Sequence, residues 1–191
     1  MQPRISIITI CYNAASTISR TLRSVSAQTY PNIQYLIIDG ASKDNTLELV
    51  RELAPEAEVY SERDKGIYDA MNKGLDRATG DYVWYVNAGD ALASPTTVED
   101  LVRATCTGDS LPDVLYGDTR LIDAEDHDLG LRRLRPPHQL DWRSFRSGML
   151  VCHQAFVAKR SISPHYDLSY RFSADVDWCI RVLKEAKTTA F

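Results

Sequence analysis

One stretch of the sequence ends a run of strand-forming residues on small and acidic ones. Residues 82–86 are aromatic or β-branched, which is typical of a buried strand, and Asn87-Ala88-Gly89-Asp90 follows at once. In an open α/β sheet, ligands bind at the carboxyl ends of the strands. A carboxylate there suits a hard cation and the phosphates it carries, and Gly89 lets a ligand approach closely. A polar turn that closes a core strand is the alternative, and this stretch alone does not decide between them.

A second acidic position lies near the C-terminal end of the sequence. The spacing of Trp178, Cys179, Val182 and Leu183 predicts a helix that begins near Ser173. At 100° per residue, Asp175 lies at the centre of the apolar face and Asp177 points the opposite way. A carboxylate on a core-facing position must be paired, capped or catalytic. Acids in a first helical turn also suit the helix dipole without any function, so both interpretations stay open.

Three further polar groups have both a functional and a structural explanation. His153-Gln154 interrupts a predicted strand over 148–157, and an isolated His in an apolar run is often a hydrogen-bonded core residue. Three arginines before Pro136-Pro137 could hold an anionic acceptor or form a solvated face: Arg132, Arg133 and Arg135. The acids of the turn 123–128 lack the Gly and distal Glu of an EF-hand loop, which predicts a plain solvated turn.

The elements that must position these residues alternate between strand and helix. Strands are predicted at residues 5–10, 35–38, 59–60, 82–86 and 113–116. Helices are predicted between them. The first has Ser16 as N-cap and extends to Gln28, and the second follows an Asn45/Glu48 capping box and ends before Pro55. The other two cover residues 67–78 and 97–104. Such alternation predicts an α/β fold with a mostly parallel central sheet flanked by helices. Residues 121–122 and 129–134 are expected to form a hairpin on one edge.

Composition excludes several classes of protein. With 191 residues and 44% hydrophobic content, the chain is expected to form a single domain over 1–191 with a substantial core. A net charge of −4 argues against a nucleic-acid binder. The four cysteines have no paired spacing, which predicts buried thiols in a reducing compartment. We see no leader peptide and no apolar run of transmembrane length, so a cytoplasmic location is expected.

One type of reaction needs this inventory of carboxylates at the ends of strands and at a helix start. A nucleotide-diphosphate donor requires a cation to neutralise its phosphates as the bond to the leaving oxygen breaks. It also requires groups that hold the nucleotide and a separate carboxylate that accepts a proton from the nucleophile. Neither the G-x-G-x-x-G loop of dinucleotide enzymes nor a Walker loop is present. Diphosphate binding must therefore depend on a metal and on side chains.

At these residues the chain resembles the family 2 glycosyltransferases, whose GT-A fold is a nucleotide-binding α/β sandwich. It is similar in particular to the branch that assembles bacterial surface polysaccharides, such as colanic-acid and O-antigen sugar transferases. The resemblance extends over nearly the whole chain, and its most specific segment is D-K-G-I-Y-D-A-M-N-K-G. The other segments that carry it are I-T-I-C-Y-N-A, Q-T-Y-P-N-I, I-I-D-G-A-S-K-D-N-T, A-T-G-D-Y, N-A-G-D, Y-G-D, C-H-Q-A-F and A-D-V-D-W.

The resemblance implies a role for individual residues on the donor side. Tyr12 and Asp39 would hold the nucleobase, and Asp64 would lie beside the same nucleotide pocket. Asp90 would bind Mg²⁺ or Mn²⁺ across the diphosphate of a donor expected to be a UDP-sugar, with Asn87 at the first position of the family's D-x-D-type motif.

On the acceptor side, the resemblance implies that Asp175 is the general base of an inverting transfer to a growing glycan or a lipid-linked acceptor. Asp177 would orient the helix start or the acceptor, and His153 and Gln154 would line the donor-sugar or acceptor cleft. A lipid-linked acceptor would bring the protein into peripheral contact with the inner face of the membrane.

Two departures from the family pattern keep an alternative open. Relatives often have Asp where Gly89 stands, and they usually continue beyond the position of Phe191, so a missing C-terminal segment is expected. A nucleotide-sugar-binding module with little or no turnover is therefore the alternative to an active transferase. A nicotinamide oxidoreductase is disfavoured by the absence of the glycine loop.

Overall fold

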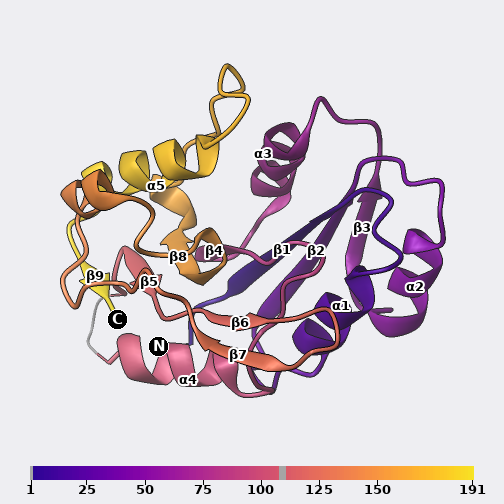
Figure 1. Ribbon diagram of the computed structural model, residues 1–191, viewed down its shortest axis with the longest axis horizontal. Coiled ribbons are helices and arrows are strands. Elements are labelled where there is room, and N and C mark those ends of the chain that lie inside the picture. The colour runs from indigo at the N-terminus through magenta and orange to yellow at the C-terminus, as the bar shows by residue number, and fades with distance from the viewer. Residues whose placement is uncertain (1, 108–110) are drawn as a thin grey trace.

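A computed structural model describes residues 2–107 and 111–191. Within these residues the chain forms a seven-stranded sheet in the order β3-β2-β1-β4-β8-β5-β9, and a separate two-stranded sheet, β6-β7. Helices cover both faces of the large sheet (Figure 1). The predicted α/β class with a mostly parallel, helix-flanked sheet is confirmed.

The first half of the chain is a set of parallel strands joined by crossover helices. The strands are β1 (Ile5–Cys11), β2 (Ile33–Asp39), β3 (Glu58–Ser61) and β4 (Tyr82–Tyr85), and the helices between them are α1 (Ile18–Ser26), α2 (Thr46–Leu53) and α3 (Ile67–Arg77). Every residue of β1 is buried, as expected for a strand covered on both faces. The register places Cys11 opposite Asp39, so the polar ends of neighbouring strands meet at one edge of the sheet.

Alternating residues of the strands divide the core into two layers. Ile8 and Ile10 of β1 face a cluster that contains Met71 of α3 and Trp178 of α5 (Ala174–Glu185). The odd-numbered residues of β1 face the other cluster, which contains side chains of α1, α2 and α4 (Thr97–Thr105). Figure 1 shows α3 and α5 on one side of the sheet and the other three helices on the opposite side. The sheet therefore carries its polar strand ends between two packed layers.

The second half of the chain departs from the alternation. After β5 (Val114–Tyr116), β6 (Arg120–Ile122) and β7 (Asp128–Leu131) form an antiparallel hairpin as predicted, but this hairpin is a sheet of its own and not an edge of the main one. The remaining elements are three 3₁₀ turns at Trp142–Ser147, His153–Ala155 and Arg160–Ile162, the strands β8 (Phe156–Lys159) and β9 (Thr189–Ala190), and α5. Strand β8 runs antiparallel between β4 and β5.

Three local predictions are wrong. The run 148–157 is not one strand, because the Ala155 N–H donates to the Cys152 carbonyl at 2.9 Å and closes a turn, and β8 begins only at Phe156. The capping box is also absent, since Asn45 makes no side-chain capping hydrogen bond. Asp44 instead accepts the backbone N–H of Thr46 at 3.1 Å. Ser16 is not the N-cap of α1 either, because the helix begins at Ile18 after Thr17, which makes no side-chain capping hydrogen bond.

Candidate active site

A cavity of about 180 Å³ opens where the carboxyl end of β4 meets α3 and α5. Its walls come from α3, from the loop after β4, from the segment before β8 and from the first turn of α5; the lining residues are Ile67, Tyr68, Met71, Asn87, Met149, Cys152, His153, Gln154 and Asp175. Four of them were predicted as site residues from the sequence. A larger hollow of about 270 Å³ at the amino end of β4 contains none of the predicted site residues.

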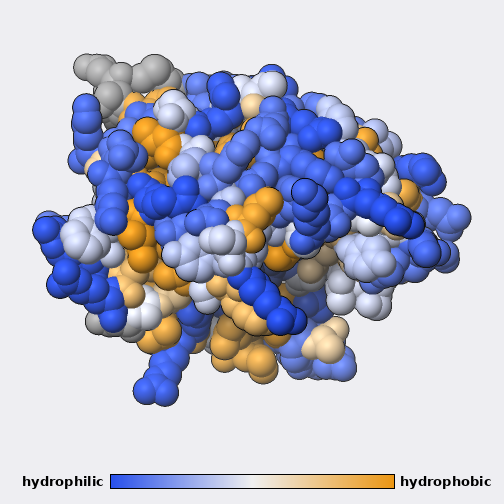
Figure 2. All heavy atoms as spheres, turned by 90° about the horizontal axis from the view of Figure 1, so that it is seen from above, coloured by the Kyte–Doolittle hydropathy of each residue, from blue (hydrophilic) through white to orange (hydrophobic). Residues whose placement is uncertain are grey.

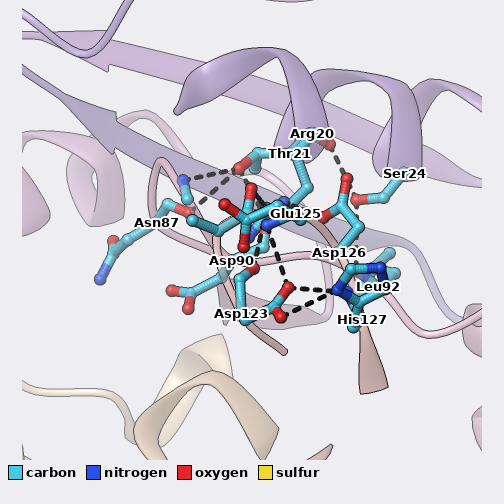
Figure 3. Close-up of polar contacts among 12 residues, drawn as sticks. Arg20, Thr21, Ser24, Asn87, Asp90, Leu92, Asp123, Glu125, Asp126 and His127 are labelled. Atoms are coloured by element: carbon cyan, nitrogen blue, oxygen red, sulfur yellow. Dashed lines mark hydrogen bonds and ion pairs between the residues drawn. The ribbon is translucent and has the colours of Figure 1, made fainter. Parts of the chain in front are cut away.

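The loop that carries Asp90 is held by α1. The buried hydroxyl of Thr21 donates to the Asp90 carbonyl at 2.6 Å and accepts the N–H of Gly89 at 2.9 Å. The Asp90 N–H closes the loop by donating to the carbonyl of Asn87 at 2.9 Å. Figure 3 shows Thr21 of α1 next to the loop that carries Asp90, with Asn87 and Asp90 on the side away from Asp126 and His127. Hydrogen bonds to its main-chain groups therefore fix the loop after β4, and they do not engage the Asp90 carboxylate.

Asp90 is half-buried, and within residues 2–107 and 111–191 its carboxylate has one side-chain partner. Its Oδ2 accepts the Nε2–H of Gln154 at 2.9 Å, so Asp90 adjoins the cavity through a residue that lines it. Burial raises the pKa of the Asp90 carboxyl, and the hydrogen bonds from Gln154 and from its own loop oppose that rise. A divalent cation would relieve the same desolvation by supplying a positive charge.

The oxygens near Asp90 fit a hard cation. Asn87 Oδ1 is buried and has no hydrogen-bond partner within the part of the chain that the structure describes. A buried carbonyl oxygen without a donor normally requires an explanation, and a bound ion is one. Carboxylate and amide oxygens are the ligands that Mg²⁺ and Mn²⁺ prefer. Asn87 and Asp90 are therefore the residues that could hold the predicted metal.

Asp175 also lines the cavity. It lies in the first turn of α5 and is half-buried, and its Oδ1 accepts the hydroxyl of Tyr68 at 3.3 Å. Asp177 instead pairs with Arg181, with 2.7 Å between Oδ2 and Nε, and does not line the cavity. The structure thus separates the two acids as the helical periodicity predicted. Both predicted roles of Asp177, at the helix start and toward the acceptor, stay predictions.

His153 has a core position at the edge of the cavity, and its contact with a substrate stays a prediction. The ring is 4% exposed, and its Nε2 hydrogen-bonds to the hydroxyl of Tyr166 at 2.7 Å. Burial lowers the pKa of His153 to about 4, against the pull of the Asp175 charge, so the imidazole is neutral near pH 7. It is a hydrogen-bonded core histidine that also forms part of the cavity wall.

Gln154 connects the cavity to the sheet. Besides its bond to Asp90, its Oε1 accepts the thiol of Cys152 at 2.8 Å, and its carbonyl accepts the indole N–H of Trp84 at 2.7 Å. Both ends of the residue are thus anchored, which fixes the direction of the amide that meets Asp90.

The residues predicted to hold the nucleobase gather at the ends of β1, β2 and β3. Tyr12 has 61% of its surface exposed at the end of β1, as a ring available for stacking would be. A Cβ added at Gly40 would lie 2.6 Å from Asp64 Oδ2 and 3.2 Å from Tyr12 Cδ2, so both side chains converge on that glycine. These residues lie outside the cavity lining described above.

Asp39 differs from its neighbours because its side chain is fully buried. Its carboxylate accepts the Ser42 N–H at 3.0 Å and the Ser61 hydroxyl at 2.6 Å, and it also accepts the Ser42 hydroxyl. Burial, with the Asp39 charge as the next cause, raises the pKa of the neighbouring Cys11 thiol above its usual range. As the residues stand, Asp39 fixes the turn after β2, and its contact with a nucleobase stays a prediction.

The three arginines before Pro136 have different partners. Arg132 donates to the carbonyl of Met149, a cavity residue, at 2.7 Å. Arg135 forms two hydrogen bonds of 2.5 Å to Asp118, and Arg133 is exposed. Of the three, Arg132 is the one that the structure brings beside the cavity.

The acidic turn between β6 and β7 is exposed, but it is anchored to α1. Arg20 pairs with Asp126 at 2.5 Å and donates to the carbonyls of Asp123 at 3.2 Å and Ala124 at 3.1 Å (Figure 3). The Asp123 carboxylate accepts the N–H of His127 at 2.8 Å and also pairs with its ring. These contacts hold the turn against α1.

On the face seen in Figure 2, apolar side chains form separate patches among mainly hydrophilic ones. Among residues 2–107 and 111–191, no helix combines the length and the apolar character needed to cross a membrane.

Sequence reasoning missed several residues of the cavity, among them Tyr68, Met149 and Cys152. Tyr68 stands inside the D-K-G-I-Y-D segment and Cys152 directly before His153, so proximity to quoted motifs was the available signal. Met149 had no such signal, because the turn that brings it to the cavity interrupts a run expected to be a strand.

Comparison with known sequences identifies relatives over most of the chain. The family model described as glycosyl transferase family 2 matches residues 6–165. An uncharacterized glycosyltransferase of Mycobacterium tuberculosis is 33% identical over 186 residues, covering 94% of this chain and 68% of its own. A PGL/p-HBAD biosynthesis glycosyltransferase of Mycobacterium bovis is 32% identical over 188 residues, covering 94% and 69%. The putative teichuronic acid biosynthesis glycosyltransferase TuaG of Bacillus subtilis is 36% identical over 93 residues, covering 47% and 37%.

Solved structures share the fold. S. aureus TarS 1-349 in complex with UDP aligns with a TM-score of 0.75 at 15% identity, covering 97% of this chain and 56% of that one. The mannosyltransferase PcManGT from Pyrobaculum calidifontis, in complex with GDP-Man and Mn2+, aligns with a TM-score of 0.72 at 17% identity, covering 100% and 55%. The chain therefore spans little more than half the length of these structures, and the similarity confirms the predicted GT-A fold.

Proposed function

The chain belongs to glycosyl transferase family 2, and on that premise we propose that it transfers one sugar from a nucleotide-diphosphate donor to the hydroxyl of a growing glycan or lipid-linked saccharide. The observation that carries the proposal is the cavity between α3, β4 and α5. Asp175, Asn87 and Gln154, the partner of Asp90, all line this cavity. An acid that activates an acceptor can thus act across a small space from a site that holds the donor phosphates.

The donor would bind along the carboxyl ends of the parallel strands. The exposed ring of Tyr12 would stack on the base, and Asp64 would contact the nucleoside beside Gly40, where a side chain would block the approach. Asp39 would reach the base only if the turn carrying Ser42 opened. UDP is the preferred nucleotide because UDP is the ligand in the TarS complex.

Asn87 and Asp90 would hold a divalent cation, Mg²⁺ or Mn²⁺, against the diphosphate. A bound ion would supply the positive charge that stabilises the leaving phosphate oxygen when the bond to the anomeric carbon breaks. Support comes from the chemistry of the two oxygens and from Mn2+ in the mannosyltransferase complex. Gln154 would keep the Asp90 carboxylate in place while one of its oxygens remains available.

Asp175 would be the general base. Its carboxylate would accept the proton of the acceptor hydroxyl as that oxygen bonds to the anomeric carbon and the diphosphate departs with the bonding electrons. Attack from the side opposite the leaving group inverts the configuration at that carbon. His153 is neutral near pH 7 and would form part of the wall that orients the sugar, without competing for this proton.

We further propose that residues 1–191 act as one domain in the cytoplasm, in peripheral contact with the membrane if the acceptor is lipid-linked. Two core layers that share the same central strands support the single domain. Four free cysteines are consistent with a reducing compartment.

The first test is a screen of nucleotide sugars for thermal stabilisation with and without Mn²⁺, followed by assay of the stabilising donors for nucleotide release with saccharide acceptors. We expect one nucleotide class to raise the melting temperature only when the metal is present, and to be released when an acceptor is added. No metal-dependent stabilisation by any nucleotide sugar would contradict the proposal.

A nucleotide-sugar-binding module with little turnover is the second candidate, and Gly89 favours it. This residue adopts a φ of +102°, a conformation that the Asp of related sequences would adopt only under strain. The loop is therefore built around the glycine. Tight donor binding without sugar release, across a panel of acceptors, would support this candidate over the transferase.

A further inference from the structure

Beyond the residues already assigned, we infer that Tyr68 is a positioning residue that holds the carboxylate of Asp175 in the orientation needed to accept the acceptor proton. The inference rests on the proposed function, because it assigns a partner to the proposed base. Tyr68 belongs to the first turn of α3, whereas Asp175 belongs to the first turn of α5, and both line the same cavity.

The contact is a hydrogen bond between residues far apart in the sequence. The Tyr68 hydroxyl donates to Asp175 Oδ1 at 3.3 Å across a separation of 107 residues. Hydrogen bonds in catalytic sites are often long without substrate and shorten when the site is filled. With one oxygen engaged, the other carboxylate oxygen remains available to the acceptor.

The ring of Tyr68 is held by a stack of aromatic side chains. It lies against Tyr166, with 5.7 Å between ring centroids and 17° between planes, and Tyr166 in turn stacks on Trp178 at 5.2 Å and 9°. Tyr166 is also fixed to Asn72 of α3 by two hydrogen bonds, of 3.0 and 2.7 Å. Since Trp178 belongs to α5, the stack connects α3, which carries the Tyr68 hydroxyl, to α5, which carries the Asp175 carboxylate.

The start of α5 gives Tyr68 a second contact. The N-cap residue Ser173 makes no side-chain capping hydrogen bond and adopts a left-handed φ of 63°. The Tyr68 hydroxyl lies beside the backbone of Ala174 and Asp175, at that same turn. Burial, with the Asp175 charge as the next cause, raises the pKa of Tyr68, so its hydroxyl keeps the proton that it donates.

These contacts predict what the hydroxyl does for the reaction. A hydrogen bond to a carboxylate restricts its rotation and favours its charged form, which is the form that accepts a proton. Removing the hydroxyl while keeping the ring should therefore leave the stack and the fold in place. It should allow the carboxylate to turn away from the acceptor, and it should require a higher pH to keep the base ionised.

The test is Tyr68→Phe, assayed for transfer over a range of pH. We expect kcat to fall by about 10- to 100-fold, the size of the effect of a misplaced catalytic group, with the donor KM unchanged. The acidic limb of the pH–rate profile should move to higher pH. The matched control is Tyr60→Phe, because the Tyr60 hydroxyl also donates to a carboxylate at 3.3 Å, that of Glu58, but lies outside the cavity.

A second measurement separates positioning from damage to the fold. In the Asp175→Asn background, adding Tyr68→Phe should cost no further activity, because the hydroxyl acts through the carboxylate. An additional loss there, or equal losses in the Tyr60 and Tyr68 variants, would overturn the inference. So would a Tyr68→Phe enzyme with the kcat and pH profile of the wild type, and in that case the proposed transferase would stand. Absence of transfer by the wild-type protein would remove the proposed function and this inference together.

Discussion

The two ends of the candidate site are held together in different ways. At the nucleotide end, the Asp39 carboxylate accepts hydrogen bonds from Ser42 and Ser61, which lie 3 and 22 residues away within the same parallel unit. At the reaction end, Asp90 depends on Gln154, 64 residues away, and Asp175 on Tyr68, 107 residues away.

This difference indicates which end of the site depends on contacts within the parallel half and which depends on long-range contacts. The nucleotide end forms with the strands themselves, so a change there should reduce stability as well as binding. The reaction end forms only when the segment before β8 and the start of α5 pack against the parallel half. A change there should reduce turnover and leave stability nearly unchanged.

Replacing Asp175 with Asn should produce the largest effect. The variant loses the proposed base and should lower kcat by about 10²- to 10⁴-fold, while donor binding measured by calorimetry stays near that of the wild type. Asp100→Asn is a matched control, because Asp100 also stands in the first turn of a helix and has the same favourable position in the helix dipole. Full activity of Asp175→Asn would exclude it as the base.

Replacing Asp90 with Ala should weaken donor binding through the metal. Loss of an outer partner of a metal ligand typically costs 10- to 100-fold in affinity, so loss of a ligand should cost at least about 100-fold. Calorimetry of UDP binding with and without Mn²⁺ measures this, and the difference between the two conditions should disappear in the variant. Gln154→Ala should give a smaller loss of about 10-fold, since it removes the partner and not the ligand. Metal-dependent binding that survives Asp90→Ala would place the ion elsewhere.

Asp39→Asn tests the nucleotide end of the site. The amide offers one acceptor oxygen in place of two, so a donor from Ser42 or Ser61 loses its partner inside the turn. We expect the free energy of unfolding to fall by about 1–3 kcal/mol, measured by urea denaturation. Asp175→Asn, measured in the same way, should change it by less than about 0.5 kcal/mol. Equal losses of stability in both variants would remove the distinction between the two ends.

The parallel half was the more predictable half because its signals are local. Continuous apolar runs such as 5–10 bury both faces of a strand, and the stripe from Ile67 to Ala78 specifies a helix by period alone. Strand ends then place Asp39, Asp64 and Asp90 at one edge without further information. The same logic placed Asp175 on the inner face of its helix.

The second half resisted prediction because long-range contacts shape it. A turn at Cys152 interrupts an apolar run that is typical of a strand. The same turn places His153 and Gln154 in the wall of the cavity. Strand β9 is only two residues long and pairs with β5, a partner that periodicity cannot identify. The complete burial of Asp39 was also beyond sequence reasoning, since its partners are Ser42 in the loop after β2 and Ser61 at the end of β3.

The smallest expected effect is the pH dependence of metal-dependent donor affinity. It distinguishes the two ends of the site without any substitution in the protein. Burial raises the pKa of Asp90 above that of an exposed carboxyl, so the proton competes with the ion at a higher pH than it would at the surface. Metal-dependent donor affinity should be complete above that pKa and fall by up to about 10-fold per pH unit below it, whereas metal-independent binding should not follow this curve. His153 does not interfere, because its pKa of about 4 keeps it neutral from pH 5 upward. In Gln154→Ala the opposing hydrogen bond is gone, so the fall should begin at higher pH; an unchanged curve would show that Gln154 does not hold Asp90 in solution.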